Sequence, residues 1–260
     1  MTNEPLDGRS HDHVCLAYDD PATLATHARA WLTAGAAAGQ RTWYLGPGEP
    51  PAGTGARHVR MDTAYTAGAE FDPAAQAAVF MGAFRQALAA GFTGLSVVAD
   101  VTPLVRTAAR RRAFCRYEHL IDRFMAQHRL SGMCAFRRAE LDDQGLAELA
   151  CLHPAANVAV PFRLHACRPE LGRAELAGEL DINTAALLHI AMDRVALLPG
   201  PGEEVVLHAA GLRFADHRTL LRLDDWAAGR DATMVLRAAP AAVARLAGLL
   251  GLRRIRVEAG

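Results

Sequence analysis

Lysine is absent from this sequence, and all 28 of its basic residues are arginines. A chain without lysine cannot form a Walker A phosphate loop, a lysine Schiff base or the serine–lysine dyad of class A β-lactamases. Serine is scarce as well: only Ser10, Ser96 and Ser131 occur, and none lies in a Gly-x-Ser-x-Gly nucleophile elbow. These absences exclude P-loop nucleotide hydrolysis, Schiff-base chemistry and catalysis of the α/β-hydrolase type.

Cysteines are few, and no two of them form a Cys-x-x-Cys pair. Their positions are 15, 115, 134, 151 and 167, and an odd number does not suit a disulfide framework. No apolar run approaches the ~20 residues of a membrane span, and the N-terminal MTNEPLDGRS lacks the apolar core of a signal peptide. We therefore expect a cytoplasmic protein with reduced thiols and no membrane partner.

Positive and negative charges balance, because 28 acidic residues match the 28 arginines. A net charge of zero gives no general reason to expect binding to nucleic acid or to an anionic membrane. Arginines cluster at 110–116, but no aromatic platform accompanies them, so we interpret them as the solvated face of a helix and rank a nucleic-acid-binding function last. With 260 residues, 51% of them hydrophobic, the chain can form one or two globular domains.

Apolar segments alternate with amphipathic segments along the whole chain, which predicts an α/β protein. In the first part we expect strands at 13–18, 41–45, 56–61, 95–101, 131–136 and 158–166. Their order, with helices between most of them, favours a mostly parallel sheet wrapped by helices. In the second part we expect strands at 174–181, 204–207, 232–236 and 253–257, with helices at 183–197 and 241–250 and a third that begins after Asp216. The predicted organisation is a disordered arm at 1–10, a domain at 11–167, a link at 168–173 and a domain at 174–260.

The stretch 204–226 carries the clearest helix signal. An apolar strand is followed by a short loop and then by Asp216, whose carboxylate is the predicted N-cap of the next helix. Leu220 and Leu223 repeat at helical spacing, and we expect Gly229 to end the helix in a left-handed conformation. A polar loop at a helix N-terminus predicts a site for an anion or for a docking partner.

Side chains with metal-ligand chemistry alternate near the start of the chain. His11, His13 and Cys15 would point to one face of a strand. There, imidazole and thiolate groups could hold zinc or iron with a further ligand from Cys134 or from the pair at 151 and 153. The alternative is that these cysteines are small buried apolar residues. The candidate metal ligands are His13, Cys15, Cys134 and His153.

Three segments resemble the motifs of the MEDS domain: DHVCLAY at 12–18, GMCAF at 132–136 and LHP at 152–154. The resemblance covers about residues 11–166. It implies an α/β fold that is related to RecA-like ATPases but lacks their phosphate loop, and a role in sensing small hydrocarbon derivatives in prokaryotic signalling proteins. The family often has tyrosine where this chain has Phe136. The sensing residues that the resemblance implies are His13, Cys15, Tyr18, Cys134 and His153.

The second part resembles the STAS domain of anti-sigma-factor antagonists, through GELD at 178–181, FAD at 214–216 and the segment after Pro240. The phosphorylatable serine or threonine of that family would fall at His217, which cannot accept phosphate in the same way, and the nearest hydroxyl is that of Thr219. The resemblance implies an anti-sigma factor or a kinase-like switch protein as partner. The implied partner-contact residues are Phe214, Ala215, Asp216, His217, Arg218 and Thr219.

Our hypothesis from the sequence is a non-catalytic bacterial signalling regulator in which the first domain senses a small ligand and the second binds the partner. The cofactor is unknown, with an organic ligand and a metal ion both open, and the oligomeric state is open as well, a homo-oligomer included. The alternative is an enzyme with a thiolate–imidazole pair, either His13 with Cys15 or Cys134 with His153.

Overall fold

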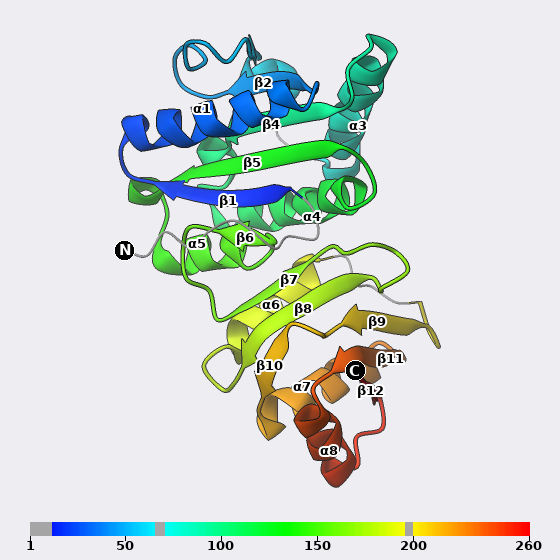
Figure 1. Cartoon of the computed structure of the whole chain (residues 1–260). Helices are drawn as coiled ribbons and strands as arrows, with labels where there is room; N and C mark the ends of the chain where they lie inside the picture. The colour runs from blue at the N-terminus through cyan, green and yellow to red at the C-terminus, as the bar shows by residue number, and fades with distance from the viewer. Residues whose placement is uncertain (1–11, 66–70, 196–199) are drawn as a thin grey trace. The chain divides into compact units, whose positions relative to one another are not determined.

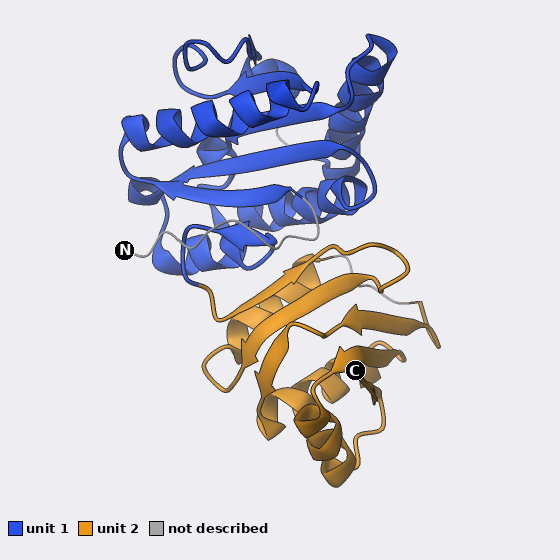
Figure 2. Ribbon diagram, viewed as in Figure 1, with its two compact units in different colours: residues 1–159 blue, residues 160–260 orange. Residues whose placement is uncertain are grey.

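A computed structural model describes residues 12–65, 71–195 and 200–260 (Figure 1). The chain divides into two compact units, residues 1–159 and residues 160–260, each with its own sheet (Figure 2). The predicted arm at 1–10 and His11 lie outside the described residues. Both units combine parallel strands with helices, which confirms the α/β class that the alternating pattern predicts.

Sheet A of the first unit runs in the order β3-β2-β4-β5-β1-β6, and each neighbouring pair is parallel. Its strands are β1 (His13–Tyr18), β2 (Arg41–Leu45), β3 (Arg57–His58), β4 (Leu95–Asp100), β5 (Leu130–Arg137) and β6 (Ala155–Ala156). The helical segments of this unit are α1 (Pro21–Ala37), α2 (Met61–Ala64), α3 (Pro73–Ala89), η1 (Thr102–Leu104), α4 (Ala108–Met125), η2 (Arg138–Glu140) and α5 (Asp143–Ala150). The prediction of a parallel sheet wrapped by helices is therefore confirmed for this unit.

The two faces of sheet A are covered by different helices (Figure 1). Leu24 and Leu32 of α1 pack in one core cluster with Leu16 of β1. On the opposite face, the rings of Phe80 in α3 and Tyr117 in α4 lie 6.2 Å apart between their centroids. Because side chains alternate along a strand, neighbouring residues of β1 enter two separate cores.

The boundary between the units lies earlier than the sequence pattern suggests. The strand expected at 158–166 is β7 (Phe162–His165), and it pairs antiparallel with β8 of the second unit. Residues 168–173, expected as a link between domains, therefore connect two strands of one sheet. An apolar pattern identifies a short strand but contains no information on which sheet it joins, and this accounts for the difference.

Sheet B of the second unit runs in the order β10-β8-β9-β11-β12, with β7 also paired to β8. Besides β7, its strands are β8 (Ala174–Leu180), β9 (Glu204–His208), β10 (Leu212–Ala215), β11 (Thr233–Ala239) and β12 (Ile255–Ala259). The helices of this unit are α6 (Ala185–Arg194), α7 (His217–Ala228) and α8 (Ala241–Leu250). The end of the helix predicted at 183–197 lies outside the described residues, and β10 was expected as loop. In the part of the chain that the structure describes, no helix has both the length and the apolar character needed to cross a bilayer.

Helix α7 begins as predicted and ends differently. The Asp216 carboxylate accepts a hydrogen bond from the Thr219 backbone amide at 2.7 Å, which confirms the predicted N-cap. Gly229 has φ −63°, so the prediction of a left-handed glycine there is wrong. Gly229 and Arg230 follow the last helical residue before Asp231 takes the positive φ of 48°. The helix stop is thus made by an aspartate, a residue that tolerates this conformation better than most.

Candidate functional site

The first strand places His13 in the interior of the first unit. Leu16 and Tyr18 pack on the α1 face, so His13, of the opposite parity, faces α4. His13 is fully buried, and its Cα is paired with that of Gly132 in β5. A Cβ at Gly132 would lie 2.8 Å from Cε of Met125 and 3.6 Å from Cδ2 of His13. The glycine therefore leaves space for the end of the Met125 side chain, whereas its added Cβ would be in ordinary contact with the imidazole.

Glu118 of α4 lies at the centre of a buried group of polar side chains. Its Oε2 is 3.1 Å from Nε2 of His13 and 3.0 Å from Nε2 of His153. The Cys134 thiol donates to Oε1 of Glu118 at 3.4 Å, and its sulfur lies 3.7 Å from Nε2 of His13. None of the four side chains is more than 7% exposed. We call His13, Glu118, Cys134 and His153 the donor cluster.

Each imidazole of the donor cluster is also held through its other nitrogen. Nδ1 of His13 lies 2.8 Å from Oδ1 of Asp122, and Nδ1 of His153 lies 2.9 Å from the carbonyl oxygen of Leu149. A carbonyl oxygen can only accept a hydrogen bond, and so can an ionised carboxylate, so these partners assign a proton to both Nδ1 atoms. The two Nε2 atoms are then the ones directed at Glu118.

Burial and neighbouring charges together determine the pKa values of this cluster. Burial lowers the pKa of His13, but the Asp122 carboxylate together with the hydrogen bonds to Cys134 and Glu118 outweighs burial, and the pKa lies well above its ordinary value. Burial raises the pKa of the Glu118 carboxyl, whereas the two imidazoles lower it more strongly, to about 2. Burial and the negative charge of Glu118 together raise the pKa of the Cys134 thiol to about 12. In the metal-free protein the cluster is therefore an ion pair between imidazolium and carboxylate, next to a neutral thiol.

These shifts predict how the stability of the metal-free protein depends on pH. A raised pKa means that His13 contributes fully below its unfolded value of about 6.5 and that the contribution is lost as the pH rises through the folded value. A lowered pKa means that Glu118 contributes fully above about 4.5 and loses the contribution as the pH falls toward 2. Both contributions are complete between about pH 4.5 and 6.5. We expect the difference in unfolding free energy between wild type and His13→Gln to be largest there and to shrink by up to about 1.4 kcal/mol per pH unit above 6.5.

The measurement is urea unfolding of the first unit at a series of pH values in the presence of a chelator. Trp31 and Trp43 report on this unit alone when Trp226 of the second unit is replaced by phenylalanine in every variant. The exposed His58, changed to glutamine, is the control and should give a small difference without this pH profile. A His13→Gln effect that is the same at pH 6 and pH 9 would contradict the prediction.

A small cavity adjoins the donor cluster. Its volume is about 20 Å³, and His13, Glu118 and Cys134 line it together with the rings of Tyr65 and Tyr117. A space of this size can hold roughly one water molecule or one ion. It is too small for a drug-sized organic molecule, which needs a pocket of ~300 Å³ or more.

The sequence of this unit matches the model of one family: MEDS, the MEthanogen/methylotroph, DcmR Sensory domain. The match spans residues 12–154, which is more than half of the 260-residue chain. The chain belongs to the MEDS family. All four members of the donor cluster lie inside the matched region. No curated protein and no solved structure is significantly similar to the chain.

Cys15 of the MEDS unit does not join the donor cluster, although the sequence placed it among the metal ligands. The ligand atoms of the cluster all lie within 4.8 Å of one another, and that group does not include the Cys15 sulfur. Two residues along a strand advance the chain by about 6.6 Å, so His13 and Cys15 share a face without reaching one point. Burial, with nearby Cys134 and Glu118 as further causes, raises the pKa of the Cys15 thiol well above its ordinary value.

Tyr18 lies on the other face of sheet A, apart from the donor cluster. Its hydroxyl donates to Oδ2 of Asp100 at 2.7 Å, and the guanidinium of Arg137 lies 5.7 Å from the centre of its ring. Burial and the bond to Asp100 raise the pKa of Tyr18 to about 12. Residue 18 has the opposite strand parity to residue 13, so grouping both in one sensing site contradicts the alternation of side chains in β1. Tyr18 belongs to a separate polar group at the C-terminal edge of the sheet.

Phe136 packs beside the donor cluster of the MEDS unit without contributing a polar atom. Its ring is fully buried and meets the imidazole of His153 edge to face, with 6.3 Å between the centroids. A tyrosine at this position, as the MEDS resemblance would have, could supply a hydroxyl near His153. In this chain the ring supplies only an apolar wall, which keeps water from that side of the imidazole.

Glu118 and Asp122 are the functional residues that sequence reasoning missed. They are interleaved with the arginines of the helix for which the sequence pattern predicts a solvated face, yet they are 2% and 1% exposed. They are four residues apart, next to Tyr117 and Ile121, which belong to the buried stripe. Two acidic residues at i and i+4 inside an apolar stripe are rarely buried without cationic or hydrogen-bonding partners, and this is the signal that could have identified them.

The second unit exposes only part of the surface predicted to contact a partner. Phe214 is 50% exposed, and His217 and Arg218 are exposed beside it, whereas Asp216 is partly buried as a helix cap. Ala215 and Thr219 are buried, at 4% and 1%, so they cannot contact a partner without unfolding, and the prediction for these two is corrected. Ala215 alternates with the outward Phe214 on β10, and Thr219 faces inward from the first turn of α7.

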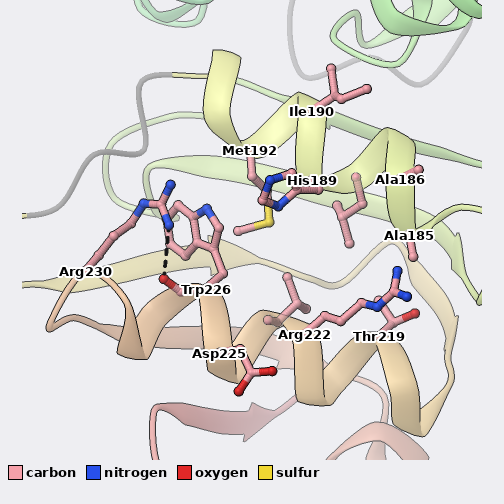
Figure 3. Close-up of a pocket in the computed structure, with 12 residues that line it drawn as sticks. Ala185, Ala186, His189, Ile190, Met192, Thr219, Arg222, Asp225, Trp226 and Arg230 are labelled. Carbon is pink, nitrogen blue, oxygen red and sulfur yellow. Dashed lines mark hydrogen bonds between the residues drawn. The ribbon is translucent and has the colours of Figure 1, made fainter.

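A groove of about 670 Å³ runs between α6 and α7 of the same unit (Figure 3). Its walls are largely apolar and include Leu188, Met192 and Leu223. At one end Arg230 lies over the ring of Trp226, 4.3 Å from its centre, and donates to the carbonyl oxygen of the same residue at 3.3 Å. Of the six residues predicted to contact a partner, Thr219 alone lines this groove. The groove and the exposed Phe214 are therefore distinct features.

Proposed function

We propose that this MEDS-family protein is a non-catalytic bacterial signalling regulator, which senses a ligand at the donor cluster and binds a partner protein through its second unit. MEDS is a family of sensory domains, which supports the signalling role. The observation that carries the proposal is the donor cluster itself. Four buried side chains with ligand or hydrogen-bond chemistry converge in the core of the matched unit, at a desolvation cost that an apolar core would not have. Such costs are typical of functional sites.

An enzyme with a thiolate–imidazole pair is the second candidate, because Cys134 and His13 lie within 3.7 Å. Catalysis by such a pair needs a thiolate that a substrate can reach. The Cys134 thiol is 7% exposed, its pKa is raised to about 12, and the adjoining cavity is about 20 Å³. These properties favour sensing over covalent catalysis at this cysteine.

For the second unit we propose a STAS-like role in binding an anti-sigma factor or a related switch protein, and through it an effect on transcription. The order β8-α6-β9-β10-α7-β11-α8-β12 supports this, because it contains the strand, capped helix and repeated βα units of the resemblance. Two exposed apolar side chains support a docking surface at this place. Phe214 lies in β10, and Ile182, 44% exposed, follows the adjacent β8. Both lie next to the Asp216 cap, whose carboxylate interacts with the backbone N–H of Ile182.

Signalling requires that the ligand stabilise one conformational state over another. A ligand that binds one state more tightly shifts the equilibrium by that difference in affinity and by no more. The donor cluster joins β1, α4, β5 and the residue three positions after α5, so its occupancy affects elements from both ends of the MEDS unit. We propose that this change in the MEDS unit alters the affinity of the second unit for its partner.

Replacing the exposed Phe214 with a charged residue tests the proposed partner surface. Phe214→Asp in the full chain should weaken binding to the purified anti-sigma factor of the same bacterium by at least about 30-fold, because a buried aromatic anchor is typically worth 2 kcal/mol or more. Leu249→Asp is the matched control, since Leu249 is also apolar, is 86% exposed and lies in α8 of the same unit. Isothermal titration calorimetry gives both affinities, and circular dichroism checks that both variants are folded.

Equal binding by wild type and Phe214→Asp would overturn the proposed surface, and equal losses in both variants would indicate a non-specific effect of charge. Thr219→Ala should leave the affinity unchanged, because the hydroxyl is buried. A comparison of the wild-type affinity with and without ligand in the MEDS unit then tests the coupling. An affinity that no ligand changes would contradict the sensing half of the proposal.

A further inference from the structure

The donor cluster contains more inward-facing lone pairs than its own protons can satisfy. With His13 protonated on both nitrogens, Nε2 of His153 still directs its lone pair at Oε2 of Glu118 from 3.0 Å, and loss of the His13 Nε2 proton, 3.1 Å from the same oxygen, would add a second lone pair. Among the described residues, neither Oε2 of Glu118 nor Nε2 of His153 has a hydrogen-bond partner. Lone pairs that face one another in a buried site repel, unless a positive charge lies between them. The arrangement therefore fits a cation at the point where the three atoms meet.

We propose that His13, Glu118, Cys134 and His153 bind one divalent transition-metal ion of the zinc class. Imidazole, carboxylate and thiolate are the protein ligand types of zinc, which usually takes four ligands in tetrahedral geometry. With bonds of ~2.0–2.3 Å, the donor atoms of a tetrahedral site lie roughly 3.3–3.8 Å apart. Oε2 of Glu118 lies 3.0 and 3.1 Å from the two Nε2 atoms, and the Cys134 sulfur lies 3.7 Å from Nε2 of His13. These separations are close to that range, and all ligand atoms lie within 4.8 Å of one another.

The charges and the surrounding hydrogen bonds support the same assignment. A thiolate and a carboxylate together neutralise a divalent ion, which lowers the cost of burying it. Asp122 and the carbonyl of Leu149 hold the Nδ1 atoms at 2.8 Å and 2.9 Å, and this is how metal-bound histidines are usually oriented. Magnesium and calcium are disfavoured because they require sites made mainly of oxygen atoms. An organic ligand is disfavoured by the cavity of about 20 Å³.

This inference rests on the proposed function in one respect: it names the ligand of the same site. The metal ion is then either the sensed species or the group through which the MEDS unit holds one conformation. Metal binding and sensing can be disproved independently of each other. Metal binding concerns only the donor cluster, whereas sensing requires that residues 160–260 respond when the cluster is filled.

The test uses the full chain, purified without a metal-affinity tag and stripped with a chelator. Because the cluster is buried, Co²⁺ is added during refolding from urea, and absorption spectra are recorded before and after Zn²⁺ is added. We expect one Co²⁺ per chain, with the visible bands of a tetrahedral ion and a thiolate-to-cobalt charge-transfer band that Zn²⁺ abolishes. These bands identify thiolate ligation in the wild type, whether or not any variant folds.

Variants then assign the ligands. Cys134→Ala should abolish the charge-transfer band and weaken Co²⁺ binding at least 100-fold, and Glu118→Gln should weaken it comparably. Asp122→Asn should cost 10–100-fold by loosening the orientation of His13. Cys15→Ala is the matched control, a buried cysteine two residues from His13, and should bind within threefold of wild type. No stoichiometric Co²⁺ in the wild type, or a charge-transfer band that persists in Cys134→Ala, would overturn the metal site.

Hydrogen exchange in residues 160–260, measured with and without Zn²⁺ on the same samples, separates the two proposals. Stoichiometric binding with unchanged exchange supports the metal site and counts against metal sensing. Absence of binding overturns the metal site but leaves the proposed regulator to be tested with small organic ligands and the partner protein. Binding accompanied by changed exchange supports both.

Discussion

The Glu118→Ala variant should lose about 3–5 kcal/mol of unfolding free energy in its first unit, in the absence of metal. Removing one member of a buried ion pair leaves the other member desolvated and unpaired, and this costs far more than the pair itself is worth. In the wild type, Glu118 lies within 3.1 Å of two imidazoles. Its loss leaves the buried Asp122 to hold the charge of His13 alone and opens a cavity beside Tyr117. Glu118→Gln, which fills the space without the charge, should lose less.

The stability measurement is the same urea unfolding, monitored through Trp31 and Trp43 in the Trp226→Phe background. Glu140→Ala is the control, because Glu140 pairs with Arg106 at 2.6 Å on the surface of the same unit and its side chain is 29% exposed. Exposed ion pairs contribute about 0–1 kcal/mol, so this variant should remain near the wild type. A loss below about 1 kcal/mol for Glu118→Ala would mean that the cluster is not a desolvated ion pair.

The second large effect is on thiol chemistry. In the folded, metal-free protein, iodoacetamide should alkylate Cys134 at least about 1000-fold more slowly than in urea at the same neutral pH. A shift of the thiol pKa from 9.0 to about 12 reduces the reactive thiolate fraction by this factor. Burial in the core reduces the rate further. Mass spectrometry of the peptide that contains Cys134 gives the two rates separately from those of the other four cysteines.

Glu118→Gln provides the control for this mechanism. Removing the negative charge next to the sulfur should lower the thiol pKa and increase the native rate, while the burial of the cysteine stays the same. A wild-type rate within tenfold of the unfolded rate would contradict the assignment of a neutral thiol. It would also revive the alternative of a Cys134 nucleophile with His13 as its base.

The sequence was sufficient to predict most of the first unit and the start of α7. Short, nearly continuous apolar runs between helical segments indicate the parallel strands of sheet A directly, because both faces of those strands are buried. Asp216 was recognisable as a cap because its side chain acts locally, on an amide three residues later. The partner of β7 was not predictable, since strand pairing depends on segments that are distant in the sequence. The short β10, with Arg213 and Phe214 exposed, has too few buried residues for a strand pattern.

For the site, the sequence identified the members of the donor cluster on β1, on β5 and in the turn after α5, and it missed the member on α4. His13, Cys134 and His153 were found through their motifs, and the structure brings these three together. Cys15 and Tyr18 were grouped with them because motif positions do not specify distance or the face of the sheet. Glu118 was missed among the arginines of α4, because charge alone does not show whether a position on a helix faces the solvent or the core. Parity along β1 would have separated Tyr18 from His13, and the rise of two residues along the strand would have separated Cys15. An acidic i, i+4 pair beside the apolar stripe would have identified Glu118.

The donor cluster draws its first member from the opening strand of the MEDS unit and its last from a turn near the end of the matched region. During synthesis, the site cannot assemble until His153 has left the ribosome, when nearly all of the unit has been made. A bound ion would then act as a cross-link that closes a loop of almost the whole unit. By analogy with disulfides, loops of ~100 residues gain roughly 4–5 kcal/mol from such closure. The ion would thus bind only once the unit is complete, and it would then make the unit more resistant to the unfolding that proteases require.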